Sequence, residues 1–122
     1  PSELLTSPAK DVLDIDRQAQ IARQKRVRGQ LRSISAAIKI YRQQYEEKKP
    51  TLKDLSNSAL VHLDMPDMTL FGYKYKIVYA PDNSNSFMLV AIPVKAGPQI
   101  KHGQDGSFWV RPSDKLPWKK SK

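Results

Sequence analysis

The longest regular feature of the sequence is a stretch between Pro8 and Glu47 that carries no further proline and only one glycine. Within it, apolar residues recur at spacings of four, three, four, three and four. Such spacing is typical of one face of an α-helix, and here it continues for about five turns. The stretch therefore predicts one long helix over residues 8–47. Its core-facing residues are expected to be Val27, Leu31, Ile34, Ile38, Tyr41 and Tyr45.

The predicted helix is too long for the body that a chain of this size can form. Ser7-Pro8 is a suitable start, with a hydroxyl that can cap free N–H groups and a proline that lacks one. Residues 8–47 would span about 60 Å at 1.5 Å per residue, whereas a domain of 122 residues is roughly 30 Å across. We therefore expect residues 8–26 to be helical, to project from the body and to be largely exposed.

The projecting half keeps a thinner apolar stripe, in which small residues follow a spacing of four and three. A partner helix could lie along such a stripe, with basic side chains at its flank. The sequence thus predicts an assembly surface on this half. Its residues are expected to be Ile15, Ala19, Ala22, Arg23 and Arg26.

The rest of the chain predicts a short helix followed by an antiparallel sheet. Pro50 ends the long helix, and Thr51 with Asp54 forms a capping pattern within a short helix and loop over residues 51–60. Residues 73–79 alternate in polarity and residues 87–94 are nearly all apolar, as in two paired strands. Two further stretches complete the prediction: a closing strand at 107–111 within a sheet over 71–111, and a basic tail over 112–122 that frays.

Together these segments predict a single α+β domain over residues 1–122. The long helix is expected to pack on a small antiparallel sheet of three or four strands, because its apolar stripe and the two apolar strands each supply half of a core. No run of residues approaches the ~18 apolar positions of a membrane span.

The formal net charge of +9 is concentrated near the start and at the end of the chain. Residues 17–32 carry six basic side chains and no acid, and residues 111–122 carry five basic side chains and one acid. Such stretches suit phosphates, acidic lipid head groups or an acidic protein surface, and charge alone does not choose among them. The predicted basic patch comprises Arg17, Arg23, Lys25, Arg26, Arg28 and Arg32.

Residues that could perform catalysis or bind a metal are scarce. The chain has no cysteine, its two histidines (His62 and His102) lie 40 residues apart, and the adjacent pair Glu46-Glu47 diverges on a helix. The turn at 103–106 offers calcium a single carboxylate, so a hairpin turn is the better interpretation. We therefore expect no catalytic residue, no metal, no cofactor and no enzymatic activity.

Three tyrosines, Tyr73, Tyr75 and Tyr79, share one face of the strand at 73–79. Such a row can stack the bases of a single-stranded nucleic acid, as in sheets that bind RNA. More often it covers a helix, and core packing is the favoured interpretation here.

The order of these parts resembles type IV pilins and the pseudopilins of type II secretion. The helix ends in Ser33-Ile34-Ser35-Ala36-Ala37-Ile38-Lys39-Ile40-Tyr41 and continues into Lys49-Pro50-Thr51-Leu52-Lys53-Asp54-Leu55. The sheet opens with Phe71-Gly72-Tyr73-Lys74-Tyr75 and closes with Phe87-Met88-Leu89-Val90-Ala91-Ile92-Pro93 and Asp105-Gly106-Ser107. The resemblance covers roughly residues 18–111 and implies a structural subunit or accessory of a pilus-like or secretion filament, associated with a membrane.

The chain also departs from that family. Mature members begin with an apolar membrane helix of about 25 residues, whereas this sequence opens with Pro1-Ser2-Glu3-Leu4-Leu5. If a membrane helix precedes Pro1, the resemblance implies a location on the periplasmic or extracellular face of a bacterial inner membrane. Expected partners are other pilin-like subunits, secretion machinery proteins and acidic lipid head groups.

A nucleic-acid-binding module is the alternative function. It would use the basic helix over Arg17–Arg32 and the C-terminal lysines. Phosphate binding of this kind weakens steeply with salt, which distinguishes it from assembly through a helix.

Overall fold

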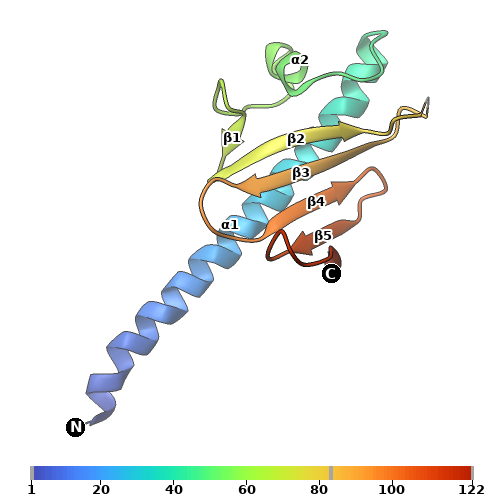
Figure 1. The fold of residues 1–122 in the computed structure, drawn as a ribbon. Helices are drawn as coiled ribbons and strands as arrows, with labels where there is room; N and C mark the ends of the chain where they lie inside the picture. The colour runs from blue at the N-terminus through green and yellow to red at the C-terminus, as the bar shows by residue number, and fades with distance from the viewer. Residues whose placement is uncertain (1, 83, 122) are drawn as a thin grey trace.

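The computed structural model describes the backbone of residues 2–82 and 84–121, and the side chains of residues 17–82 and 84–121. One long helix, α1 (Ser2–Gln44), crosses one face of a six-stranded antiparallel sheet and continues well beyond it at the N-terminal end (Figure 1). The fold is therefore α+β, with the long helix on the sheet.

The sheet is a meander in which every strand pairs with its sequence neighbours, in the order β1-β2-β3-β4-β5-β6. Its strands are β1 (Thr69–Leu70), β2 (Tyr73–Tyr79), β3 (Phe87–Pro93), β4 (Gln99–Gly103), β5 (Phe108–Arg111) and β6 (Lys119–Ser121). The prediction of three or four strands was wrong, because β1 has only two residues and β6 is short and polar, so neither shows a strand pattern.

The basic tail does not simply fray over 112–122, because β6 pairs with β5 and places Lys120 opposite Trp109. Strand β6 forms because of this pairing and not because of its own residues, since lysine and serine have low strand propensity.

The core lies between α1 and the inner face of the sheet. Val27, Leu31, Ile34 and Ile38 are fully buried, as the spacing of four and three requires. Against them pack residues that point inward from the central strands: Tyr73, Tyr75, Phe87, Leu89, Ala91, Ile100 and Phe108. A short helix, α2 (Leu52–Asn57), adds Leu52 and Leu55, and the expected capping box of Thr51 and Asp54 is present.

Both ends of the predicted long helix differ from its bounds in the structure. The helical backbone already includes Ser2, so Ser7-Pro8 does not mark its start; a proline costs a helix one hydrogen bond without necessarily ending it. At the other end α1 stops at Gln44. Tyr45 is consequently not a core residue: it is 49% exposed and stacks on the half-buried Tyr41, with 4.5 Å between ring centroids.

Candidate functional site

The described N-terminal part of α1 lies outside the core. Each residue from Arg17 to Ala22 is exposed, and Val27 is the first buried residue of α1 among those whose side chains are described. Ala19, Ala22, Arg23 and Arg26 of the predicted assembly surface are exposed, as is Ile21. The fifth member, Ile15, lies outside the residues whose side chains are described. Figure 1 shows this part of α1 extending past the end of the sheet.

The six residues of the predicted basic patch do not form one surface. Arg17, Arg23, Lys25 and Arg26 are exposed on the projecting half. Farther along α1, the guanidinium groups of Arg28 and Arg32 lie 5.4 and 5.1 Å from the centroid of the Phe108 ring. Arg28 also donates a hydrogen bond to Ser121 Oγ at 2.5 Å. These two arginines therefore fasten the helix to β5 and β6, since a cation over an aromatic face is attractive.

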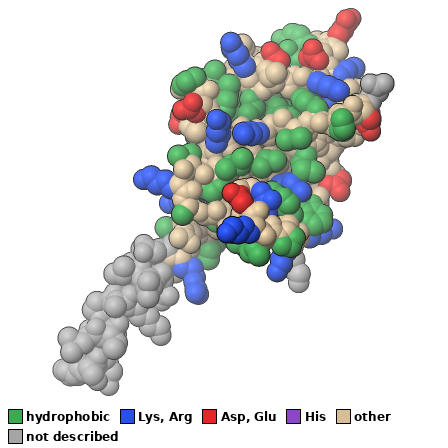
Figure 2. All heavy atoms as spheres, in the orientation of Figure 1, with side chains coloured by type: hydrophobic (Ala, Val, Ile, Leu, Met, Phe, Trp, Pro, Cys, Tyr) green, Lys and Arg blue, Asp and Glu red, His purple; other side chains and the backbone are tan. Residues whose placement is uncertain are grey.

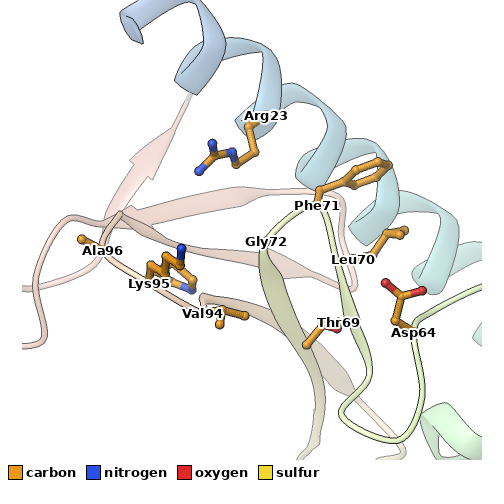
Figure 3. A pocket seen from close by; sticks show the side chains of 10 residues that line it. Arg23, Asp64, Thr69, Leu70, Phe71, Gly72, Val94, Lys95 and Ala96 are labelled. Carbon is orange, nitrogen blue, oxygen red and sulfur yellow. The ribbon is translucent and has the colours of Figure 1, made fainter.

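A hollow of about 390 Å³ lies where α1 leaves the sheet. It is bounded by Arg23, by the β1–β2 turn at Phe71-Gly72 and by the chain after β3 at 93–96. In Figure 3 the side chain of Arg23 turns toward Lys95, while Asp64 lies at the opposite side. Figure 3 thus shows one cation from α1 and one from the loop after β3 facing the same space.

The charges in this hollow are not balanced within the described part of the chain. Neither Arg23 nor Lys95 has an ion-pair partner among residues 17–82 and 84–121. Apolar side chains lie beside them, with Phe71 39% and Val94 62% exposed. Two cations next to exposed apolar groups can bind a carboxylate that a neighbouring molecule supplies together with an apolar contact.

The turn that shapes the hollow depends on backbone conformations that most residues avoid. Phe71 and Gly72 have φ angles of 56° and 77°. Glycine adopts the left-handed region at little cost, whereas phenylalanine does not. This turn holds Phe71 at the surface beside the helix.

The tyrosine row belongs to the core. Tyr73 and Tyr75 are buried and Tyr79 is half-buried, all on the face that meets α1. Each hydroxyl donates to a backbone carbonyl oxygen, of Pro98 at 2.9 Å, Leu70 at 3.3 Å and Pro50 at 2.5 Å respectively. Burial raises the pKa of Tyr79 to about 12. The row is not available to stack on nucleic acid.

The remaining titratable groups that the sequence singled out lie apart. His62 is exposed on a loop, whereas His102 is buried in β4 against Phe108, with 4.5 Å between ring centroids. The carboxylate of Asp105 accepts hydrogen bonds from the backbone and the hydroxyl of Ser107 at 3.0 and 2.7 Å, which closes the turn and lowers the pKa of Asp105. Within the described residues, no three potential metal ligands gather.

Buried His102 makes the stability of the fold sensitive to acid. Burial, with the positive charge of Arg32 second, lowers the pKa of His102 below its usual 6.5. A base whose pKa is lower in the folded than in the unfolded state stabilises the fold above pH 6.5, and that contribution is lost as the pH falls toward the folded-state pKa. We expect His102→Leu to be less destabilised than the wild type on going from pH 7 to pH 5. Urea unfolding at both pH values measures this, and equal losses in the two proteins would contradict it.

Comparison of the chain with protein-family models, with characterised proteins and with solved structures finds no match. Among the described residues, no helix has the length and apolar character needed to cross a bilayer.

One feature of the surface was missed by the sequence interpretation, which sought aromatic residues only among the tyrosines. Both tryptophans of the chain, Trp109 and Trp118, lie next to Lys101 on the face of the sheet that points away from α1. The alternation in β5, with Phe108 buried and Trp109 only half-buried, was the available signal.

Proposed function

We propose that this protein is a non-enzymatic structural subunit or accessory of a pilus-like or type II secretion filament, and that it assembles through the N-terminal half of α1. The observation that carries the proposal is the helical segment from Arg17 to Arg26, which is exposed except at half-buried Gln24 and adds no residue to the core. A helical segment that gains little from packing within its own chain depends on other contacts for its order. The order of motifs shared with pilin-like proteins supports the same function.

The chemistry around the segment indicates the kind of partner. Ala19 and Ala22 are small enough to let a second helix approach closely, and exposed Ile21 supplies apolar area. The cations Arg17, Arg23 and Arg26 favour acidic side chains of a neighbouring subunit or acidic lipid head groups. Within the hollow, Arg23 and Lys95 would bind a carboxylate of that neighbour.

The alternative function, nucleic-acid binding by the basic helix, draws less support from the arrangement of the arginines. Arg28 and Arg32 both contact the Phe108 ring, so these two guanidinium groups already pack against the sheet, although Arg32 stays exposed. A duplex groove is best matched by basic residues gathered on one face.

Reversing the charge of Arg23 tests the proposed partner contact. We expect Arg23→Glu to weaken association by about tenfold or more, because it replaces an attraction to a carboxylate by a repulsion. Sedimentation velocity over a range of protein concentrations measures the change. Lys39→Glu is the matched control, since Lys39 is exposed on the same helix where it covers the sheet. Equal weakening by both substitutions would mean that net charge, and not the hollow, controls association.

A further inference from the structure

The face of the sheet that points away from α1 carries a row of residues in register across five strands. Lys76 pairs with Val90, Val90 with Lys101, Lys101 with Trp109, and Trp109 with Lys120. Because neighbouring strands lie about 4.8 Å apart, the three lysines are spaced by roughly 10 Å along a line of about 20 Å. We call these five residues the outer row.

The surroundings of the outer row are basic and apolar. Lys74 and Arg111 point to the same side of the sheet, and none of the outward-facing residues of β2–β6 is acidic. Among the described residues, two carboxylates lie beside this face: Asp114, 3.6 Å from Arg111, and Asp105, in the β4–β5 turn next to Trp109 and near Lys120. Figure 2 looks onto the face and shows hydrophobic and basic side chains over the strands, with acidic ones mostly toward the margin.

The centre of the outer row is held in place by contacts among cations and indoles. The Lys101 ammonium lies 5.7 Å from the ring centroid of Trp109 and 4.6 Å from that of Trp118. Arg111 lies 4.7 Å from the ring centroid of Trp118, and Trp109 Nε1 donates to Ser107 Oγ at 3.3 Å. Burial, with the charge of Arg111 second, lowers the pKa of Lys101. These groups form a fixed platform with an excess of positive charge.

We propose that the outer row binds single-stranded nucleic acid, with the lysines contacting phosphates and Trp109 contacting a base. Proteins that bind single strands combine a positively charged track with aromatic side chains on which bases stack. A line in which cations alternate with uncharged side chains matches a nucleic-acid strand, in which a chain of phosphates carries aromatic bases. The face remains accessible when the N-terminal half of α1 holds a partner, so the proposal does not depend on the assembly function.

Two other polyanionic surfaces fit the outer row less well. Insertion into a bilayer needs several protruding apolar side chains, yet Met88, Val90 and Ile92 are only half-exposed on this face and Val78, at the end of β2, is the one exposed aliphatic residue among the outward-facing strand residues described. A duplex presents its bases edge-on within grooves, so its phosphates would meet the lysines while Trp109 met no base. A single strand can place its phosphates against the lysines and a base against Trp109 at the same time.

The test measures binding of the whole chain to a fluorescein-labelled oligothymidylate of 12 nucleotides by fluorescence anisotropy. The triple variant Lys76→Gln/Lys101→Gln/Lys120→Gln should bind at least tenfold more weakly at 50 mM salt. Since each phosphate contact adds about 0.7 to the salt slope for a single strand, the slope should fall by about 2. Wild-type tryptophan fluorescence should be quenched on binding, and Trp109→Ala should weaken binding by about tenfold.

A matched control removes the same charge elsewhere. Lys39→Gln/Lys49→Gln/Lys53→Gln changes three exposed lysines of α1, its following loop and α2, and should bind as the wild type does. If the triple variant of the outer row fails to fold, Lys76→Gln/Lys120→Gln keeps Lys101 between the indoles and should still lower affinity. Three results would overturn the proposal: no binding at 50 mM salt, equal losses in the outer-row and control variants, or equally tight binding of a 12-base-pair duplex or of vesicles containing anionic phospholipid.

Discussion

Truncation of Ile34 to alanine is expected to lower the free energy of unfolding by about 2–5 kcal/mol. Ile34 is fully buried at the centre of the contact between α1 and the sheet. Removing its outer carbons leaves a cavity that the close-packed surroundings fill only in part. For a domain with a total stability of about 5–15 kcal/mol, this is a large fraction. Urea unfolding followed by circular dichroism measures the loss, and the thermal midpoint should fall by roughly 10 °C or more.

Ile40→Ala is the matched control for this prediction. Ile40 lies on the same helix but is 40% exposed, and it is not part of the core cluster. We expect its truncation to cost less than about 1 kcal/mol. Similar losses for the two substitutions would show that the helix stripe does not pack on the sheet as described.

The helix stripe and the central strands could be predicted from the sequence because burial of one face imposes a period on the residues. The spacing of Val27, Leu31, Ile34 and Ile38 identified the buried face of α1. Alternation within residues 73–79 likewise identified β2, with bounds as predicted. In each case the residues carry the pattern that their own packing requires.

The prediction was wrong where the presence or the end of an element is not set by the pattern of its own residues. Strand β6 consists of Lys119–Ser121, and only its pairing with β5 makes it a strand. Tyr45 continues the apolar spacing, yet α1 has already ended at Gln44. Pro50 disfavours helical conformation in the residue before it, but the spacing alone does not show how many residues earlier the helix stops.

The surfaces proposed for binding also differ in how far the sequence alone could predict them. The projecting half of α1 could be predicted from helix length alone, since the predicted helix over residues 8–47 exceeds the width of a small body. The hollow beside Arg23 did not follow, because it needs the β1–β2 turn and the chain after β3 to meet the helix. The outer row required the register of five strands, which neither composition nor periodicity supplies.

The second large effect is expected from removing residues 1–20. Since Arg17–Arg26 contain no buried residue, the shortened chain should keep its core and unfold at nearly the same temperature as the whole chain. Assembly should be abolished, because the deletion takes away Ile15, Ala19 and much of the apolar stripe that a partner helix would cover. A fall of the thermal midpoint comparable to that of Ile34→Ala would mean that the segment supports the fold, and the account of a projecting helix would be wrong.

Sedimentation velocity on the whole chain and on residues 21–122, at matched protein concentrations, tests the central claim most directly. The account predicts that the whole chain shifts to faster-sedimenting species as its concentration rises, whereas residues 21–122 remain at the sedimentation coefficient of a folded monomer. Equal association of the two chains, or a whole chain that stays monomeric throughout, would contradict assembly through the N-terminal half of α1.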